Sequence, residues 1–146
     1  MTLYCQTLDQ LPEKYMKSLG KGSRATHFWE EDPETGADVE RYTYAWRDFQ
    51  IDLYINRRPE ICAHLESFLT YASNLARARR QTLDPDFMQR VRSTQLVIGY
   101  VAQPDIEKQD RFDRLESMIL TLSADTQSLF FWEGDIYNED GHILLT

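Results

Sequence analysis

Two apolar runs that flank one amphipathic segment, between Thr94 and Trp132, constrain the fold of this chain more than any other feature. The runs, at 95–102 and 128–132, have the length and composition of strands that are buried on both faces. The segment between them carries apolar residues at helical spacing, namely Phe112, Leu115, Ile119 and Leu122. A strand, a helix and a strand in this order predict a β-α-β unit with two parallel strands in one sheet.

The first half of the chain has the pattern of antiparallel strands. The segment 32–36, Asp-Pro-Glu-Thr-Gly, predicts a hairpin turn, because Pro presets φ and Gly supplies the left-handed position that closes the turn. The residues after it alternate between apolar and polar up to Trp46, and those at 50–55 alternate as well. Arg47 and Asp48 between them form either a tight turn or a bulge in one long strand. The strand count is therefore open by one at this position.

The segment 60–80 predicts the strongest helix of the chain. Its apolar residues, among them Leu65 and Phe68, recur at helical spacing, with Glu60 at the start and arginines near the end. We also expect short helices over 11–20 and from Asp84 to about 91, and a small C-terminal hairpin. The chain should form a single α+β domain, a mixed sheet of about five to seven strands with the 60–80 and 105–122 helices packed on it.

Length and composition place the chain among soluble proteins. With 146 residues, of which 42% are hydrophobic, the chain can bury a core without disulfides or metals. Its apolar runs are shorter than the roughly 20 residues that a membrane span requires, and the first residues lack the regions of a signal peptide. Cys5 and Cys62 are too few for a disulfide framework. We expect a protein of the bacterial cytoplasm with reduced thiols.

The formal net charge of −8 is unevenly distributed along the chain. Residues 57–92 carry 7 basic and 4 acidic side chains, whereas residues 93–146 carry 3 basic and 10 acidic ones. An acidic C-terminal third repels phosphate groups. We therefore expect neither nucleic acid nor an anionic membrane as the partner.

The sequence carries no signature of a metal, cofactor or nucleophile site. His27, His64 and His142 lie on three different predicted elements, whereas metal ligands must converge. The turn after the first apolar run has Asp105 where a phosphate-binding loop would have glycine amides. Serine and cysteine motifs of nucleophilic catalysis are missing as well. We expect no cofactor and no metal.

One candidate binding feature is an aromatic row on a predicted strand. Tyr42, Tyr44 and Trp46 share one face of it. On an exposed sheet face the three rings would form a flat platform for a partner, since Tyr and Trp are rigid anchors. The alternative is that they form the core face under a helix, which is the commoner place for aromatic residues on strands.

A second candidate is a group of arginines in an otherwise acidic protein. Arg77, Arg79 and Arg80, together with Arg90 and Arg92, could contact an acidic partner, for example the C-terminal face of a second copy of the chain. The alternative is that these cations only complement helix dipoles and keep the protein soluble.

These features favour a non-enzymatic interaction protein, an adaptor, regulator or toxin-neutralising protein, with a protein partner or a second copy as the ligand. The alternative is a small enzyme with a carboxylate-containing pocket at the carboxyl ends of the parallel strands, where open sheets bind ligands. Asp105, Glu133 and Asp135 are its candidate catalytic residues, near Gln103 and Trp132.

Overall fold

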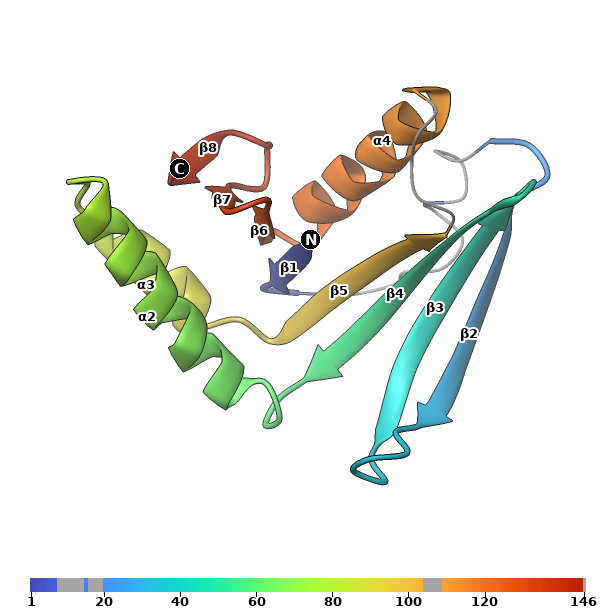
Figure 1. Ribbon diagram of the computed structural model, residues 1–146, viewed down its shortest axis with the longest axis horizontal. Helices are drawn as coiled ribbons and strands as arrows, with labels where there is room; N and C mark the ends of the chain where they lie inside the picture. Colours follow the sequence, from blue (N-terminus) through green and yellow to red (C-terminus); the bar gives the residue numbers. More distant parts are fainter. Residues whose placement is uncertain (8–14, 16–19, 104–108, 146) are drawn as a thin grey trace.

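The computed structural model describes residues 1–7, 15, 20–103 and 109–145, and this part of the chain forms one eight-stranded sheet with three helices packed on it (Figure 1). The strands are β1 (Thr2–Cys5), β2 (Arg24–Glu31), β3 (Asp38–Trp46), β4 (Phe49–Arg57), β5 (Leu96–Gln103), β6 (Leu129–Trp132), β7 (Asp135–Tyr137) and β8 (Ile143–Leu145). The helices are α2 (Cys62–Ala78), α3 (Pro85–Arg92) and α4 (Gln109–Asp125). The predicted α+β class is confirmed.

The N-terminal strand determines how the predicted β-α-β unit is built. The strand order is β2-β3-β4-β5-β1-β6-β7-β8, so β1 lies between β5 and β6. Leu3 of β1 is paired with Ile98 on one side and with Phe130 on the other, both in antiparallel register. The strands joined by α4 therefore run in the same direction without being hydrogen-bonded to each other. The prediction of a mixed sheet is wrong, because all neighbouring strands described are antiparallel.

The predicted N-terminal hairpin is confirmed as β2 and β3. In its turn the Asp32 carboxylate accepts a hydrogen bond from the backbone N–H of Glu34 at 2.8 Å, and Gly36 has a φ of 70°. Arg47 and Asp48 form a tight turn, because Trp46 and Phe49 are directly paired on either side of them. This turn separates β3 from β4, and the count of eight strands exceeds the predicted range.

Helices cover both faces of the sheet, so the molecule has three layers (Figure 1). Consecutive residues of β1 point to opposite faces. Leu3 belongs to the core under α4, which contains Met118 and Leu122. Tyr4 belongs to the core under α2 and α3, and its ring stacks on Phe68 with centroids 4.1 Å apart. Leu96, Val97 and Ile98 of β5 are buried, as the apolar run at 95–102 predicted, whereas Val101 is 45% exposed, so the prediction holds only for the first part of the strand.

The predicted helices over 60–80 and after Asp84 are confirmed as α2 and α3. The Asp84 side chain caps α3 by accepting a hydrogen bond from the backbone N–H of Asp86 at 2.9 Å. The third predicted helix corresponds to α4, whose described part begins at Gln109. The helix predicted over 11–20 lies outside the described residues except for Tyr15 and Gly20.

Candidate functional site

A pocket opens between α4 and the part of the sheet formed by β5, β6 and β7. Its walls are four half-buried aromatic side chains, each from a different element: Tyr100 of β5, Phe112 of α4, Trp132 of β6 and Tyr137 of β7. The pocket has a volume of about 150 Å³. We call this site, defined by these four walls, the aromatic pocket.

The floor of the aromatic pocket is part of the hydrophobic core. Leu115 and Ile119 of α4 and Phe130 of β6 are buried and line it from below. The Phe130 ring stacks on the Tyr137 ring, with centroids 4.6 Å apart and an interplanar angle of 9°. The ring centroids of Phe112 and Trp132 are 5.9 Å apart. Rings held by neighbouring rings in this way give the walls a fixed shape.

Two carboxylates line the aromatic pocket, together with Met1, which carries the N-terminal ammonium group. Glu116 of α4 and Asp140, which follows β7, line the pocket and are exposed. Next to it lies a more open hollow of about 390 Å³, which shares Tyr100, Phe112 and Trp132 and adds Glu133. Glu133 is also exposed. The aromatic walls therefore meet solvent beside acidic groups.

The two wall tyrosines have raised pKa values. Burial is the main cause for Tyr100, and the negative charge of Glu133 adds to it. Burial is also the main cause for Tyr137, followed by Asp135 and Glu133. Both hydroxyls are therefore protonated at neutral pH and lie in a negative electrostatic potential.

A tight turn places Tyr137 beside β6. Glu133 and Gly134 have φ values of 51° and 90°, and Trp132 and Asp135 are paired across them. Two central residues with positive φ define the two-residue hairpin turn whose twist matches that of the strands. The predicted turn at 133–135 is confirmed, and the turn brings the Tyr137 ring onto Phe130.

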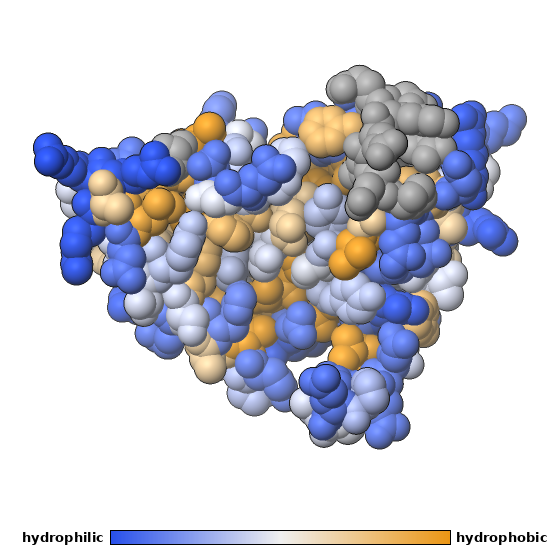
Figure 2. All heavy atoms as spheres, viewed as in Figure 1, coloured by the Kyte–Doolittle hydropathy of each residue, from blue (hydrophilic) through white to orange (hydrophobic). Residues whose placement is uncertain are grey.

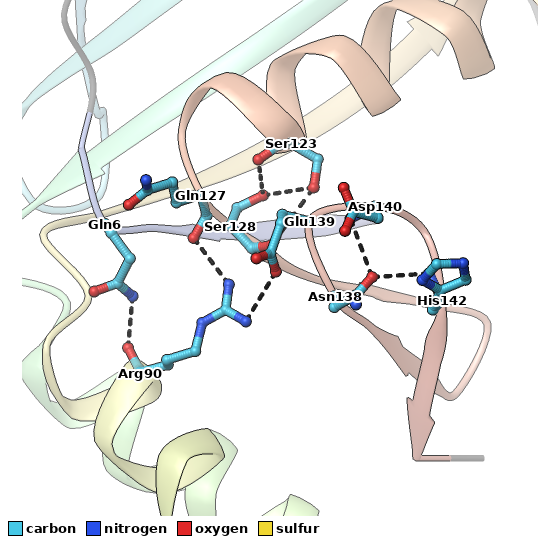
Figure 3. Close-up of polar contacts among 9 residues, drawn as sticks. All are labelled: Gln6, Arg90, Ser123, Gln127, Ser128, Asn138, Glu139, Asp140 and His142. Atoms are coloured by element: carbon cyan, nitrogen blue, oxygen red, sulfur yellow. Dashed lines mark hydrogen bonds and ion pairs between the residues drawn. The ribbon is translucent and has the colours of Figure 1, made fainter.

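A second turn, whose polar contacts are drawn in Figure 3, contributes Asp140 and Gly141 to the lining of the aromatic pocket. The Asn138 side-chain oxygen accepts hydrogen bonds from the backbone N–H groups of Asp140, at 3.0 Å, and His142, at 2.9 Å. Gly141 has a φ of 81°, and a Cβ atom there would lie 3.0 Å from Leu120 of α4. A Cβ atom at Gly141 would therefore require the Leu120 side chain to shift by a few tenths of an ångström, and the positive φ itself favours glycine.

The prediction that Tyr42, Tyr44 and Trp46 form an exposed platform is wrong. Their exposed fractions are 8%, 0% and 3%, and they pack in the core under α4. The physical reason is that this face of β3 belongs to the core cluster that also contains Tyr15 and, from α4, Leu115 and Met118, so the alternative of a core face is confirmed.

The predicted arginines are divided between two environments. Arg77, Arg79 and Arg80 are exposed at the C-terminal end of α2, where Figure 2 shows hydrophilic residues along the margin of the molecule. Arg90 instead forms an ion pair with Glu139, with its Nη1 atom 2.9 Å from Oε2, and it donates to the Gln127 carbonyl at 3.1 Å (Figure 3). Arg90 therefore holds the C-terminal hairpin to α3.

The structure brings together only part of the predicted catalytic set. Glu133 and Trp132 line the open hollow at the carboxyl ends of β5 and β6. Asp135 lies in β7 and does not line the hollow, and Asp105 lies outside the described residues.

In the described ranges, three or more His, Cys, Asp or Glu side chains nowhere gather closely enough to hold a metal ion. None of the three described helices is long and apolar enough to cross a membrane.

A polar cluster on β2, β3 and β4 has its charged groups paired with one another. The buried Glu40 carboxylate accepts hydrogen bonds from Arg57 at 3.0 and 3.3 Å and lies 3.2 Å from His27. The His27 ring stacks on Tyr42 with centroids 4.0 Å apart. Because these groups satisfy each other, the cluster stabilises the edge of the sheet.

Sequence reasoning missed three of the four walls of the aromatic pocket. Tyr100 lies in a run interpreted as a buried strand, Phe112 in the apolar stripe of a helix, and Tyr137 in a short terminal strand. Their aromatic character was the available signal, but nothing in their spacing relates them.

Comparison of the chain with protein-family models, with curated proteins and with solved structures finds no match.

Proposed function

We propose that this protein is a non-enzymatic interaction protein that binds a partner protein through the aromatic pocket. The observation that carries the proposal is the convergence of four half-buried aromatic side chains from four elements around one hollow. Large aromatic side chains in partly desolvated pockets supply most of the binding energy in protein interfaces.

The size of the aromatic pocket favours a partner side chain over a free small molecule. Sites for drug-sized ligands typically measure about 300–1,000 Å³. The aromatic pocket measures about 150 Å³, which suits one inserted side chain. Such an anchor needs a surrounding contact surface on a protein partner to reach useful affinity.

The charge of the chain supports a regulatory role, as an adaptor or a protein that neutralises a toxin. A net charge of −8 speeds the encounter with a partner of opposite charge and disfavours contact with other acidic proteins. The rim carboxylates Glu116 and Asp140 extend this negative potential to the entrance of the aromatic pocket.

The proposal is tested by affinity capture from the native host with the wild-type chain and with a Phe112→Ala, Trp132→Ala variant. A matched control is Trp29→Ala, because Trp29 is 59% exposed on β2, outside the aromatic pocket. We expect a partner that the wild type and the Trp29 variant retain and the double variant loses. Equal capture by all three proteins would contradict the use of this pocket.

A second candidate is a small enzyme that uses the open hollow. The observation in its favour is that Glu133 lines a hollow of about 390 Å³ at the carboxyl ends of β5 and β6. A turnover that Glu133→Gln abolishes and Asp135→Asn leaves intact would support this function. Turnover that is unchanged in Glu133→Gln would exclude Glu133 as its catalytic residue.

A further inference from the structure

The charged side chains that line the aromatic pocket and the adjoining hollow are all acidic in the part of the chain that the structure describes, and they face one positive group, the N-terminal ammonium of Met1, whose pKa is lowered by burial. Glu116 and Asp140 line the pocket, Glu133 lines the adjoining hollow, and neither lining contains Lys, Arg or His. Aromatic rings present a negative face and a positive edge, so ring faces and carboxylates attract the same kind of ligand.

Arg114 is the described basic residue nearest in sequence to Phe112 and Glu116, and it does not line the aromatic pocket. The Arg114 guanidinium lies over the Trp46 ring, 4.6 Å from its centroid. Trp46 is in the core under α4 and does not line the aromatic pocket. The rim carboxylates Glu116 and Asp140 are both exposed, so they keep their hydration until a ligand arrives.

The wall tyrosines report the same negative potential. The carboxylate of Glu133 raises the pKa of Tyr100 and that of Tyr137, in addition to the effect of burial. A potential that disfavours a phenolate favours a cation at the same place.

We infer that the aromatic pocket takes an organic cation, the charged end of a lysine or arginine side chain of the partner protein. The inference rests on the proposed function, which supplies the partner. The aliphatic stem of such a side chain contacts Phe112 and Trp132, while the charged end reaches the carboxylates at the rim. A neutral side chain of the same shape would gain the apolar contact and lose the attraction to rings and carboxylates.

The test compares cations with their neutral isosteres on the full chain. The probes are N-acetyl methylamides of lysine and norleucine, and of arginine and citrulline, with tetramethylammonium as a free small cation. Binding is followed by NMR at the Trp132 indole N–H, assigned with Trp132→Phe. The variants are Glu116→Gln and Asp140→Asn at the rim, and Glu66→Gln on α2, an exposed carboxylate outside the pocket, as the matched control.

We expect at least one cationic amide to bind about fivefold or more tightly than its isostere, the size of one cation–π contact. This preference should fall in Glu116→Gln and in Asp140→Asn and should persist in Glu66→Gln. Isosteres that bind as tightly as the cations, or a full preference in both rim variants, would overturn the inference. Tetramethylammonium that binds far more tightly than both amides would overturn the assignment to a side chain.

The outcomes separate this inference from the proposed function. If capture of the partner depends on Phe112 and Trp132 but the isosteres bind equally, the pocket is an apolar anchor site and only the cation is wrong. If the cations bind selectively but no captured protein depends on these residues, the proposed protein partner is wrong and the chemistry of the pocket stands.

Discussion

Arg90 of α3 joins two segments that are distant in sequence, because it pairs with Glu139 at 2.9 Å and donates to the Gln127 carbonyl at 3.1 Å (Figure 3). Its own carbonyl accepts a hydrogen bond from the Gln6 side chain at 2.7 Å. Glu139 lies beside Asp140, a rim residue of the aromatic pocket. The ion pair therefore helps to hold the wall of the pocket that the C-terminal hairpin contributes.

Replacing Arg90 by Met should lower the free energy of unfolding by about 1 kcal/mol at pH 7, since the Met side chain keeps the apolar stem and loses the polar contacts. The loss is modest because the Arg90 and Glu139 side chains are 28% and 35% exposed. Urea unfolding followed by circular dichroism measures it. A loss above about 3 kcal/mol would show that Arg90 has a further role in the core.

The contribution of this ion pair should disappear at low pH. The pKa of Glu139 is lowered, first by a hydrogen bond from its own backbone N–H and then by Arg90. A lowered folded-state pKa gives stability that is present above the unfolded value of about 4.3 and is lost as pH falls through the folded value. The difference between the wild type and Arg90→Met should therefore shrink below about pH 4. In a Glu139→Gln background, Arg90→Met should show no such pH dependence.

Trp46 and Trp132 should respond differently to truncation, because only Trp46 is fully inside the core. Trp46→Ala should cost about 3–5 kcal/mol, the usual range for a buried aromatic residue. Trp132 is half-buried at the aromatic pocket, so Trp132→Ala should cost clearly less and leave the fold intact. Urea unfolding curves of the two variants measure the difference. Equal losses would argue that Trp132 is a core residue and would weaken the proposed site.

The elements that could be predicted are those whose signals are local. The helical spacing at 60–80 and the cap at Asp84 depend only on neighbouring residues, and α2 and α3 form where they indicate. The turn at 32–36 is predictable for the same reason. The short strand β1 was missed, because its position between β5 and β6 depends on pairings with residues far along the chain.

The aromatic pocket depends on the same distant pairings. Its walls come from three strands and a helix, and Trp132 was placed near a ligand site only through the end of its strand. The row at Tyr42 and Tyr44 was the stronger sequence signal, yet both side chains are buried in the core. Spacing within a strand shows which residues share a face, whereas the burial of that face depends on segments far along the chain.

Gly141→Ala should disturb the aromatic pocket more than its size suggests. Gly141 has a φ of 81°, and the new Cβ atom would lie 3.0 Å from Leu120. Strain and contact together should cost about 1–2 kcal/mol and shift the NMR signals of Tyr137 and Leu120. Gly99→Ala is the matched control, since a Cβ atom there meets nothing within 4 Å. The prediction is wrong if the two variants are equally stable and leave these signals unchanged.

The two cysteines should differ sharply in reactivity, and the slower one should report on the centre of the sheet. Burial raises the pKa of the Cys5 thiol to about 12, although Thr126 lowers it slightly, whereas Cys62 is exposed. A thiol reagent should therefore modify one cysteine of the native protein at pH 8 and two in urea. Because β1 is paired on both sides, Cys5 should react only after β1 leaves the sheet, at a rate that rises with denaturant as global unfolding does. Fast labelling of Cys5 in a Cys62→Ser variant would show that β1 opens locally.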